Sequence, residues 1–363
     1  TVFLFVLTVL IYVHEWGHYW VAKRNGVRVE VFSIGFGPEI LGWTNNVGTR
    51  WKIGLIPLGG YVKMFGESTE DEESGEAIEM TPEEQAVSFH YKTLGQRAAI
   101  VFAGPAINYL FAIVIFAGLA MFQGSAIPLS AVGAVQPDSA AEKAGFASGD
   151  RIVAIDDKDI RLFTELQEIV VVSPGKPLDF HIVRDGAART LNATPKAVET
   201  ATGESVGRLG VSPDPAQVEY ETHNPAAAVW VGVKQTANLT VNILVYVRDM
   251  IVGSRGSDDL GGPLRIAQIS GEMAQKGVGY VVLLMAMLSV NLGLINLFPI
   301  PMLDGGHLAF YAAEAIRGKP LGPKVQEYGF RFGLILVLSL VVFVTWNDLV
   351  HLRVFEVIKD LFS

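Results

Sequence analysis

The stretch TVFLFVLTVLIYVHEWGHYWVA at residues 1–22 decides the fold, because it is apolar enough and long enough to cross a bilayer. The same stretch contains a His-Glu-x-x-His pattern, formed by His14, Glu15 and His18. On a helix the two histidines lie on one face, where they can share a zinc ion with Glu15 beside them as a general base. Such polar groups are costly inside a membrane, so we interpret them as a metal site rather than as a chance match to a short motif.

The composition is that of a polytopic membrane protein with a soluble part, since 50% of the 363 residues are hydrophobic and only 18% are charged. The formal net charge of −9 comes largely from residues 67–84, an acidic stretch that argues against nucleic acid as a partner and is typical of a solvated loop. With no cysteine in the chain, His, Asp and Glu are left to bind a metal. No cleavable signal peptide is expected at the first apolar segment.

Four apolar segments are predicted to form transmembrane helices, at about residues 1–22, 98–122, 279–298 and 329–346. Basic residues lie after the first segment, before the second, and between the third and fourth; they are Lys23, Arg24, Arg28, Lys92, Arg97, Arg317, Lys319, Lys324 and Arg331. The positive-inside rule places these loops in the cytoplasm, and both termini with the whole 123–278 region on the other side. At ~1.5 Å per residue, Glu15 lies roughly 12 Å from Lys23, so the site is expected towards the cytoplasmic side.

Between the first two spans, glycine-punctuated β patterns occupy residues 33–38 and 51–64. These strands are too short to span, and an open sheet edge cannot face lipid. We therefore predict a membrane re-entrant β element that is sheltered by protein or by a water-filled cavity, where it can pair with an extended substrate. The alternative is a cytoplasmic hairpin that does not contact the substrate.

The region at 131–213 alternates strand patterns with turns and resembles a PDZ domain, chiefly in PDSAAEKAGFASGDRIVAIDD at 137–157. A PDZ groove can accept a peptide as an added strand, whereas the alternative is a steric plug that binds no peptide. The stretch at 226–252 is amphipathic and predicts a helix lying against the membrane or this domain. His90, His181, His223 and His351 lie outside the spans and are interpreted as ordinary surface or loop residues.

A zinc protease site needs a third protein ligand and one open position for water. The stretch NLFPIPMLDGGH at 296–307 offers Asp304, after two prolines that break the helix and before a glycine pair that allows a sharp turn. Asp304 could instead be the N-cap of the helix that follows. His307 as a fourth ligand would close the water position, so a supporting or packing role is predicted for it. Asn108 is predicted to hydrogen-bond between helices.

Taken together, these motifs resemble the site-2 protease family of intramembrane zinc metalloproteases, in its bacterial regulator-of-sigma-E branch with a periplasmic PDZ region. The resemblance covers nearly the whole chain and rests also on GGYVKM at 59–64, GQRAAIVFAGPAIN at 95–108 and SVNLGLINLFPIPMLDGGH at 289–307. It implies that His14, His18 and Asp304 bind Zn²⁺ and that Glu15 activates the bound water. It also implies substrate contacts for a set of residues made up of Asn296, Gly59, Gly60, Tyr61, Val62 and Lys63. Some members carry two PDZ domains, and this chain has room for one.

The predicted fold is a polytopic α-helical membrane protein with four transmembrane helices, a re-entrant β element and an inserted α+β PDZ domain. Its predicted parts are the first half of a membrane protease domain at residues 1–122, a periplasmic PDZ domain at 131–213, an amphipathic membrane-associated helix with a linker at 214–278, and the second half of the protease domain at 279–363. The family implies cleavage of single-span proteins, such as anti-sigma factors or remnant signal peptides, in the lipid bilayer of the bacterial inner membrane. The competing interpretations are a non-catalytic PDZ adaptor and a metal transporter, although a transporter favours further ligands along a path through the membrane.

Overall fold

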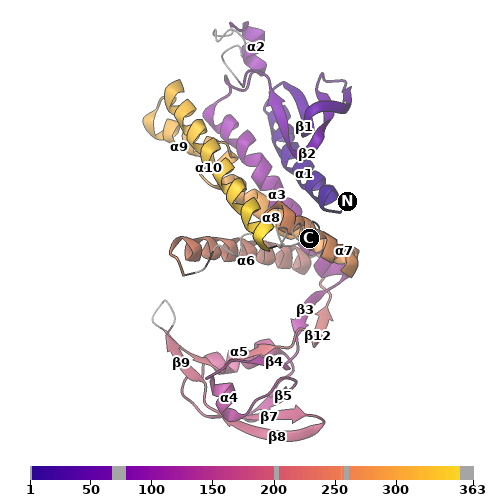
Figure 1. Ribbon diagram of the computed structural model, residues 1–363, viewed down its shortest axis with the longest axis vertical. Helices are drawn as coiled ribbons and strands as arrows, with labels where there is room; N and C mark the ends of the chain where they lie inside the picture. Colours follow the sequence, from indigo (N-terminus) through magenta and orange to yellow (C-terminus); the bar gives the residue numbers. More distant parts are fainter. Residues whose placement is uncertain (1, 68–78, 200–203, 255, 257–260, 352–363) are drawn as a thin grey trace, which may run out of the picture. The chain divides into compact units, whose positions relative to one another are not determined.

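The computed structural model describes residues 2–67, 79–199, 204–254, 256 and 261–351. The chain divides into two compact units, of which the first comprises Thr1–Gly118 with Ala226–Ser363 and the second comprises Leu119–Pro225 (Figure 1). The second unit is therefore an insertion between two halves of the first. The predicted domain at 131–213 lies within this insertion, and its boundaries remain a prediction.

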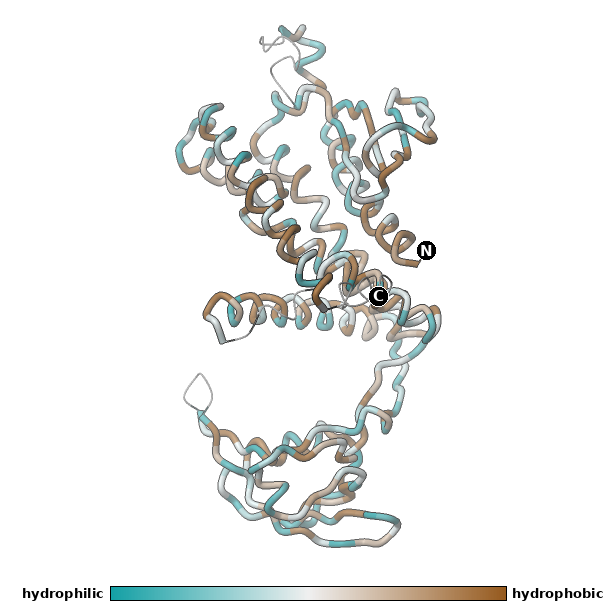
Figure 2. Tube along the Cα trace, viewed as in Figure 1, coloured by the Kyte–Doolittle hydropathy of each residue, from teal (hydrophilic) through white to brown (hydrophobic). Residues whose placement is uncertain are grey.

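Among the described residues, four helices are long and apolar enough to cross a membrane, as the sequence predicts. They are α1 (Val2–Arg24), α3 (Leu94–Phe122), α8 (Val278–Leu297) and α10 (Pro323–His351). Figure 2 shows how apolar residues run along these helices. The four remaining helices of the first unit are α2 (Pro82–Val87), α6 (Pro225–Ile251), α7 (Pro263–Lys276) and α9 (Asp304–Arg317). The predicted amphipathic helix is α6, and the stretch predicted to be a linker after it contains a further helix, α7.

Glycines bring α3 into close contact with three other helices. A Cβ atom on Gly17 of α1 would lie 2.5 Å from the Ala103 carbonyl oxygen, and one on Gly232 of α6 would lie 2.5 Å from that of Ile113. A Cβ on Gly293 of α8 would lie 3.1 Å from the Pro105 carbonyl oxygen. Small residues permit such approach between helices in lipid, where packing contacts replace the hydrophobic effect as the main attraction. The helix α3 is thus the central support of the membrane unit.

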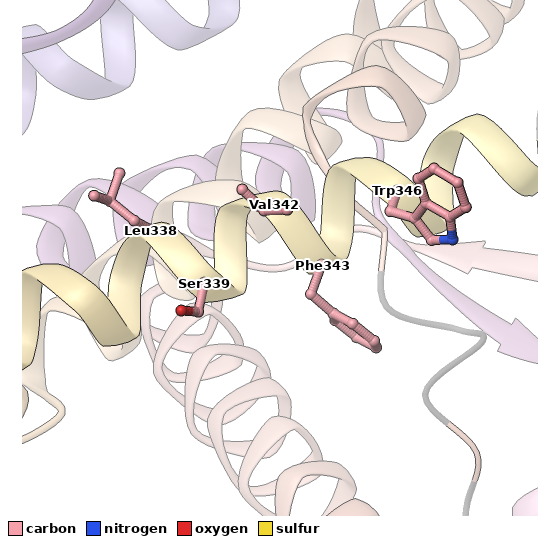
Figure 3. A pocket seen from close by; sticks show the side chains of 5 residues that line it. All are labelled: Leu338, Ser339, Val342, Phe343 and Trp346. Atoms are coloured by element: carbon pink, nitrogen blue, oxygen red, sulfur yellow. The ribbon is translucent and has the colours of Figure 1, made fainter.

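The helix α10 is the least buried span, with 11% of its apolar window buried. Along its outer side lie Leu338, Ser339, Val342, Phe343 and Trp346 (Figure 3). Asp348, near the C-terminal end of α10, is buried, unlike these exposed side chains. Asp348 is 1% exposed and accepts hydrogen bonds from the backbone N–H groups of Gly262, Leu264 and Arg265, at 2.8, 3.0 and 3.1 Å. The carboxylate caps the N-terminus of α7, which offers unpaired donors and a favourable dipole.

The predicted β element is one hairpin of two long, bent strands, β1 (Val29–Thr44) and β2 (Arg50–Met64). The first half of β1 lies between the two halves of β2, because Phe32 pairs with both Val62 and Trp51. Trp51 in turn pairs with Trp43 in the second half of β1. No other strand in the described parts of the chain pairs with β2. The segment Gly60–Met64 therefore keeps one open edge.

The second unit is β-rich and PDZ-like. Its strands are β3 (Ser125–Pro128), β4 (Val132–Val135), β5 (Arg151–Ile155), β6 (Lys158–Asp159), β7 (Leu178–Arg184), β8 (Ala187–Ala193), β9 (Lys196–Glu199), β10 (Ser205–Arg208), β11 (Val211–Pro213) and β12 (Val218–Glu221). The order β6-β5-β7-β8 forms one sheet, and β3 with β12, β4 with β11 and β9 with β10 form pairs. Two helices, α4 (Ala140–Ala144) and α5 (Phe163–Val171), pack on a core that includes Ile152, Leu166 and Phe180. A groove of about 230 Å³ runs between α5 and Gly207–Val211.

Inside this unit, Asp150 is fully buried and paired with Arg184, whose Nη2 donates to Asp150 Oδ2 at 2.7 Å. Burial acts to raise the pKa of Asp150, but the hydrogen bonds from Arg184 and from the Ala147 N–H outweigh it and hold the pKa below its ordinary value. The ionised pair fixes the loop before β5 to the end of β7.

Candidate active site

His14 and His18 of α1 meet Asp304 at the first residue of α9. The two Nε2 atoms lie 3.3 Å apart, and Asp304 Oδ2 lies 3.2 Å from that of His14 and 3.6 Å from that of His18. Ligand atoms around a tetrahedral zinc ion with bonds of 2.0–2.1 Å are about 3.3 Å apart. The three side chains form the one metal-binding group found among the described residues. The sequence prediction of these three residues is consistent with this geometry.

The chemistry of this group also fits zinc. Asp304 Oδ2 is buried and has no hydrogen-bond partner, an arrangement that is costly for a carboxylate oxygen unless a cation binds it. Two imidazoles and one carboxylate form a common protein ligand set for catalytic zinc, and they leave a fourth position for water. His307 lies in the wall of the same cavity but outside the ligand group. Burial lowers the pKa of His307, so its ring is neutral there.

Both histidine rings are held at their other nitrogen. His18 Nδ1 lies 2.9 Å from the Ile100 carbonyl oxygen, to which it can only donate. His14 Nδ1 lies 3.1 Å from the side-chain amide of Asn108 on α3, so the predicted interhelical hydrogen bond of Asn108 is confirmed and ends on a candidate metal ligand. Contacts of this kind fix the ring orientation, and here they direct both Nε2 atoms towards Asp304.

Gly104 on α3 leaves the space that the two rings occupy. A Cβ atom at this position would lie 2.2 Å from His18 Nε2 and 2.8 Å from His14 Cε1. Gly104 therefore allows α3 to approach the two histidine rings closely. Because the obstructed atoms belong to the rings of the two candidate ligands, a side chain at position 104 would displace these rings and not only the packed helices.

Asp304 reaches the histidines through a tight turn after α8. The turn contains Met302 at a φ of 88°, a strained conformation for a residue with a side chain. The expectation that the glycine pair makes this turn is wrong, because Gly305 and Gly306 lie in α9 and are buried. Their role is close approach, since Cβ atoms there would lie 2.2 Å from the Phe298 carbonyl oxygen and 2.4 Å from that of Ile300. The alternative role of Asp304 as an N-cap is also wrong, because Leu303 is the N-cap.

The three candidate ligands line a cavity of about 980 Å³ together with Glu15 and Asn296. Glu15 comes from α1, one residue after His14, and its Cγ lies 3.1 Å from where a Cβ on Gly60 would stand. The absence of a side chain at Gly60 thus lets β2 pass directly beside the carboxylate. Asn296 Nδ2 donates to the Leu292 carbonyl oxygen at 3.0 Å within α8.

The predicted substrate strand forms part of the cavity wall. Gly59, Gly60, Tyr61 and Val62 line the cavity, and the open edge of β2 lies in this segment. Lys63 is not among the lining residues, and its ammonium group lies 3.9 Å from Glu30 instead. For Lys63, only the backbone remains a candidate for substrate contact.

A second polar cluster, which the sequence analysis did not identify, lines another part of the cavity. Arg97 Nη2 donates to Glu314 Oε1 at 2.7 Å, joining the start of α3 to α9, and its guanidinium lies 4.9 Å from the centre of the Tyr311 ring. Burial raises the pKa of Tyr311 to about 12, so the phenol stays protonated. His90 also lines the cavity, and it does so from an exposed turn, in agreement with its interpretation as a surface or loop residue. The signal in the sequence that could have indicated this cluster is Arg97, a charged residue at the edge of an apolar span.

His181 contacts Thr190 and His223 contacts Ser125, both within the second unit. The side chain of His351 lies outside the described residues.

Comparison with known proteins assigns the geometry to a family. Residues 2–340 match the sequence family described as Peptidase family M50. This chain belongs to that family. It is 46% identical over 357 residues to a Rhizobium meliloti protein named as a zinc metalloprotease, with 96% of this chain and 95% of the relative covered. Identity to the metalloprotease MmpA of Caulobacter vibrioides is 37%, covering 99% of this chain and 97% of the relative.

The regulator of sigma E protease of Salmonella typhi is 34% identical, with 95% of this chain and 97% of the relative covered. A solved PDZ domain of an SdrC-like protein from Listeria monocytogenes aligns with 24% of this chain and 90% of its own at 16% identity, with a TM-score of 0.21. As a family M50 member, the chain is a multi-pass zinc metalloprotease. Membership in family M50 favours a protease over the two competing interpretations, a non-catalytic PDZ adaptor and a metal transporter.

Proposed function

We propose that this M50 protease is an intramembrane endopeptidase that hydrolyses peptide bonds within transmembrane segments of single-span membrane proteins. The observation that carries the proposal is the position of the candidate metal ligands His14 and His18, which lie inside an apolar helix long enough to span the bilayer. Asp304 is brought to them from a separate helix. A hydrolytic site at this place serves substrates that are themselves within the membrane.

In this proposal His14, His18 and Asp304 hold zinc, which when bound acts as a Lewis acid and lowers the pKa of a water molecule towards ~7. Glu15 lines the same cavity and has the chemistry of the general base. Its carboxylate accepts the proton of the attacking water and then delivers it to the leaving nitrogen. Asn296 of α8 lines the same cavity, and its side chain is proposed to hold the substrate backbone.

The open edge of β2 gives the substrate a place to bind in extended form. A peptide bond in a transmembrane helix is shielded by intrahelical hydrogen bonds, so the substrate has to unwind before hydrolysis. An unwound segment exposes backbone donors and acceptors that can pair with a free strand edge. Residues Gly59–Val62 lie in the cavity wall beside Glu15, which supports binding of such a segment next to the proposed general base.

The flanking charges support a location in the bacterial inner membrane, with the PDZ-like unit in the periplasm and the site towards the cytoplasm. Lys23 and Arg24 end α1, and Arg317 and Lys319 precede α10, on the flanks predicted to be cytoplasmic. Anti-sigma factors and remnant signal peptides are the substrate classes that we propose. The name of the Salmonella typhi relative supports the former.

Removal of metal tests the function directly. The purified full-length protein in detergent micelles is expected to cut a synthetic transmembrane segment within its apolar stretch, located by mass spectrometry. Dialysis against a chelator should reduce the rate at least about 100-fold, and one equivalent of zinc, but not magnesium, should restore it. Retained activity in protein shown to be metal-free, or cleavage confined to the soluble flanks, would refute the proposal.

The PDZ-like unit is proposed to exclude substrates with bulky outer domains. Deleting residues 131–213 is practical because Val132 pairs with Pro213, so a short linker can join the two ends. The deletion variant is expected to keep cleavage of a short substrate and to gain cleavage of one with an intact outer domain, compared in membranes with Glu15→Gln as the blank. Loss of the short substrate by a folded, zinc-loaded variant would instead favour recruitment of peptide by the groove beside α5.

A further inference from the structure

Asn108 is a fully buried amide on α3 whose side chain faces the ring of His14. We propose that Asn108 is a positioning residue that holds the ring orientation of His14 and accepts its Nδ1 proton when His14 binds zinc through Nε2. The proposal rests on the proposed function, because it takes His14 as a metal ligand. It assigns to Asn108 a role in metal affinity beyond the joining of two helices.

The position of the imidazole proton of His14 decides which ring nitrogen can bind a metal. A neutral histidine that binds a metal through Nε2 carries its proton on Nδ1, which then needs an acceptor. His14 Nε2 faces Asp304, so Nδ1 is the atom left for a supporting contact, and Asn108 lies 3.1 Å from it. No other hydrogen bond to His14 Nδ1 is found among the described residues.

An amide side chain can serve both tautomers of His14. Its Nδ2 donates to an unprotonated Nδ1, and a half-turn of the amide group presents Oδ1 as an acceptor for a protonated Nδ1. Asn108 Oδ1 is buried and has no hydrogen-bond partner, so no existing contact opposes that turn. An apolar residue at this position would leave the Nδ1 proton buried without an acceptor, which disfavours the metal-binding tautomer.

The two histidines differ in what supports them. His18 Nδ1 faces the Ile100 backbone carbonyl, which no substitution removes. The support of His14 is a side chain, so it can be altered alone. The backbone carbonyl of Asn108 also accepts a hydrogen bond from Ser289 Oγ on α8 at 2.8 Å, and both residues are fully buried. Ser289→Ala therefore removes a buried interhelical contact at the same residue without changing the amide, which makes it a matched control.

The experiment measures zinc affinity by competition with a chromogenic chelator, and the thermal stability of the metal-free protein, in detergent micelles. Asn108→Leu is expected to weaken zinc binding about 10- to 100-fold, as removal of a supporting partner of a metal ligand does. Asn108→Asp keeps an acceptor for the Nδ1 proton and is expected to bind zinc within a few-fold of wild type. Ser289→Ala is expected to lower the melting temperature with zinc affinity unchanged.

Wild-type zinc affinity in folded Asn108→Leu would overturn the proposal, as would an equal loss in Asn108→Leu and folded Asn108→Asp. If the leucine variant does not fold, Asn108→Ala is measured in its place with the same expected loss. His14→Ala separates this proposal from the ligand assignment. Full zinc affinity in His14→Ala would refute the ligand role of His14 itself, whereas a loss there with none in Asn108→Leu refutes only the role of Asn108.

Discussion

Glu15→Gln is expected to abolish cleavage of transmembrane segments while zinc stays bound. Glu15 lines the cavity beside His14 but lies outside the group of candidate ligands, so its substitution leaves that group complete. The amide cannot accept a proton from the attacking water, and general bases of this kind contribute about 10² to 10⁴ in rate. Initial rates with a labelled transmembrane substrate, measured beside the zinc content of the same sample, give both quantities.

The matched control for this variant is Glu83→Gln, which makes the same chemical change at an exposed residue of α2. It should cleave at the wild-type rate. Turnover near wild type in zinc-loaded Glu15→Gln would contradict the assignment of the general base. Loss of zinc from Glu15→Gln would show instead that the carboxylate contributes to metal binding.

Asp304→Asn is expected to lose both metal and activity. The substitution keeps the size of the side chain but removes the negative charge that faces His14 and His18 at 3.2 and 3.6 Å. A neutral amide is a poorer zinc ligand than a carboxylate, so zinc is held by two imidazoles alone. Zinc content after dialysis against a graded series of chelator concentrations should fall well before that of wild type, with activity falling in parallel.

Asp157→Asn provides the control, because Asp157 is an exposed carboxylate in the second unit. Its zinc retention should match that of wild type. Full zinc occupancy of Asp304→Asn after the same dialysis would exclude Asp304 as a ligand. Raising the zinc concentration in the assay is expected to restore part of the activity of Asp304→Asn, whereas it should not help Glu15→Gln.

The spans and the histidine pair could be predicted from sequence because their signals are local. Hydrophobic length identifies α1, α3, α8 and α10, and four-residue spacing on one helix is enough to place His14 next to His18. Asp304 could be predicted because the prolines before it mark a helix break within an apolar region. Each of these inferences uses residues that are close together in the chain.

Contacts between distant segments were harder to predict. The Asn108 to His14 contact depends on the relative register of α1 and α3, which hydrophobic patterns leave open in helices that are apolar all round. The first half of β1 pairs with both halves of β2, and this arrangement requires bends that no strand pattern in the sequence indicates. The helix α7 was not predicted because few of its residues are strongly apolar. Only Gly277 separates it from α8, so its C-terminal end is not marked by a loop.

The cap that Asp348 forms on α7 has a consequence for how the protein matures. The ribosome completes α7 more than seventy residues before it reaches Asp348, so the hydrogen bonds from the amino end of α7 to Asp348 form only after the last span has been made. The contact joins α7, which precedes the third span, to the end of the fourth span, and it forms late in synthesis. A chain stopped within α10 before Asp348 would retain every proposed zinc ligand and the general base. It would lack the hydrogen bonds that hold the N-terminus of α7 to α10.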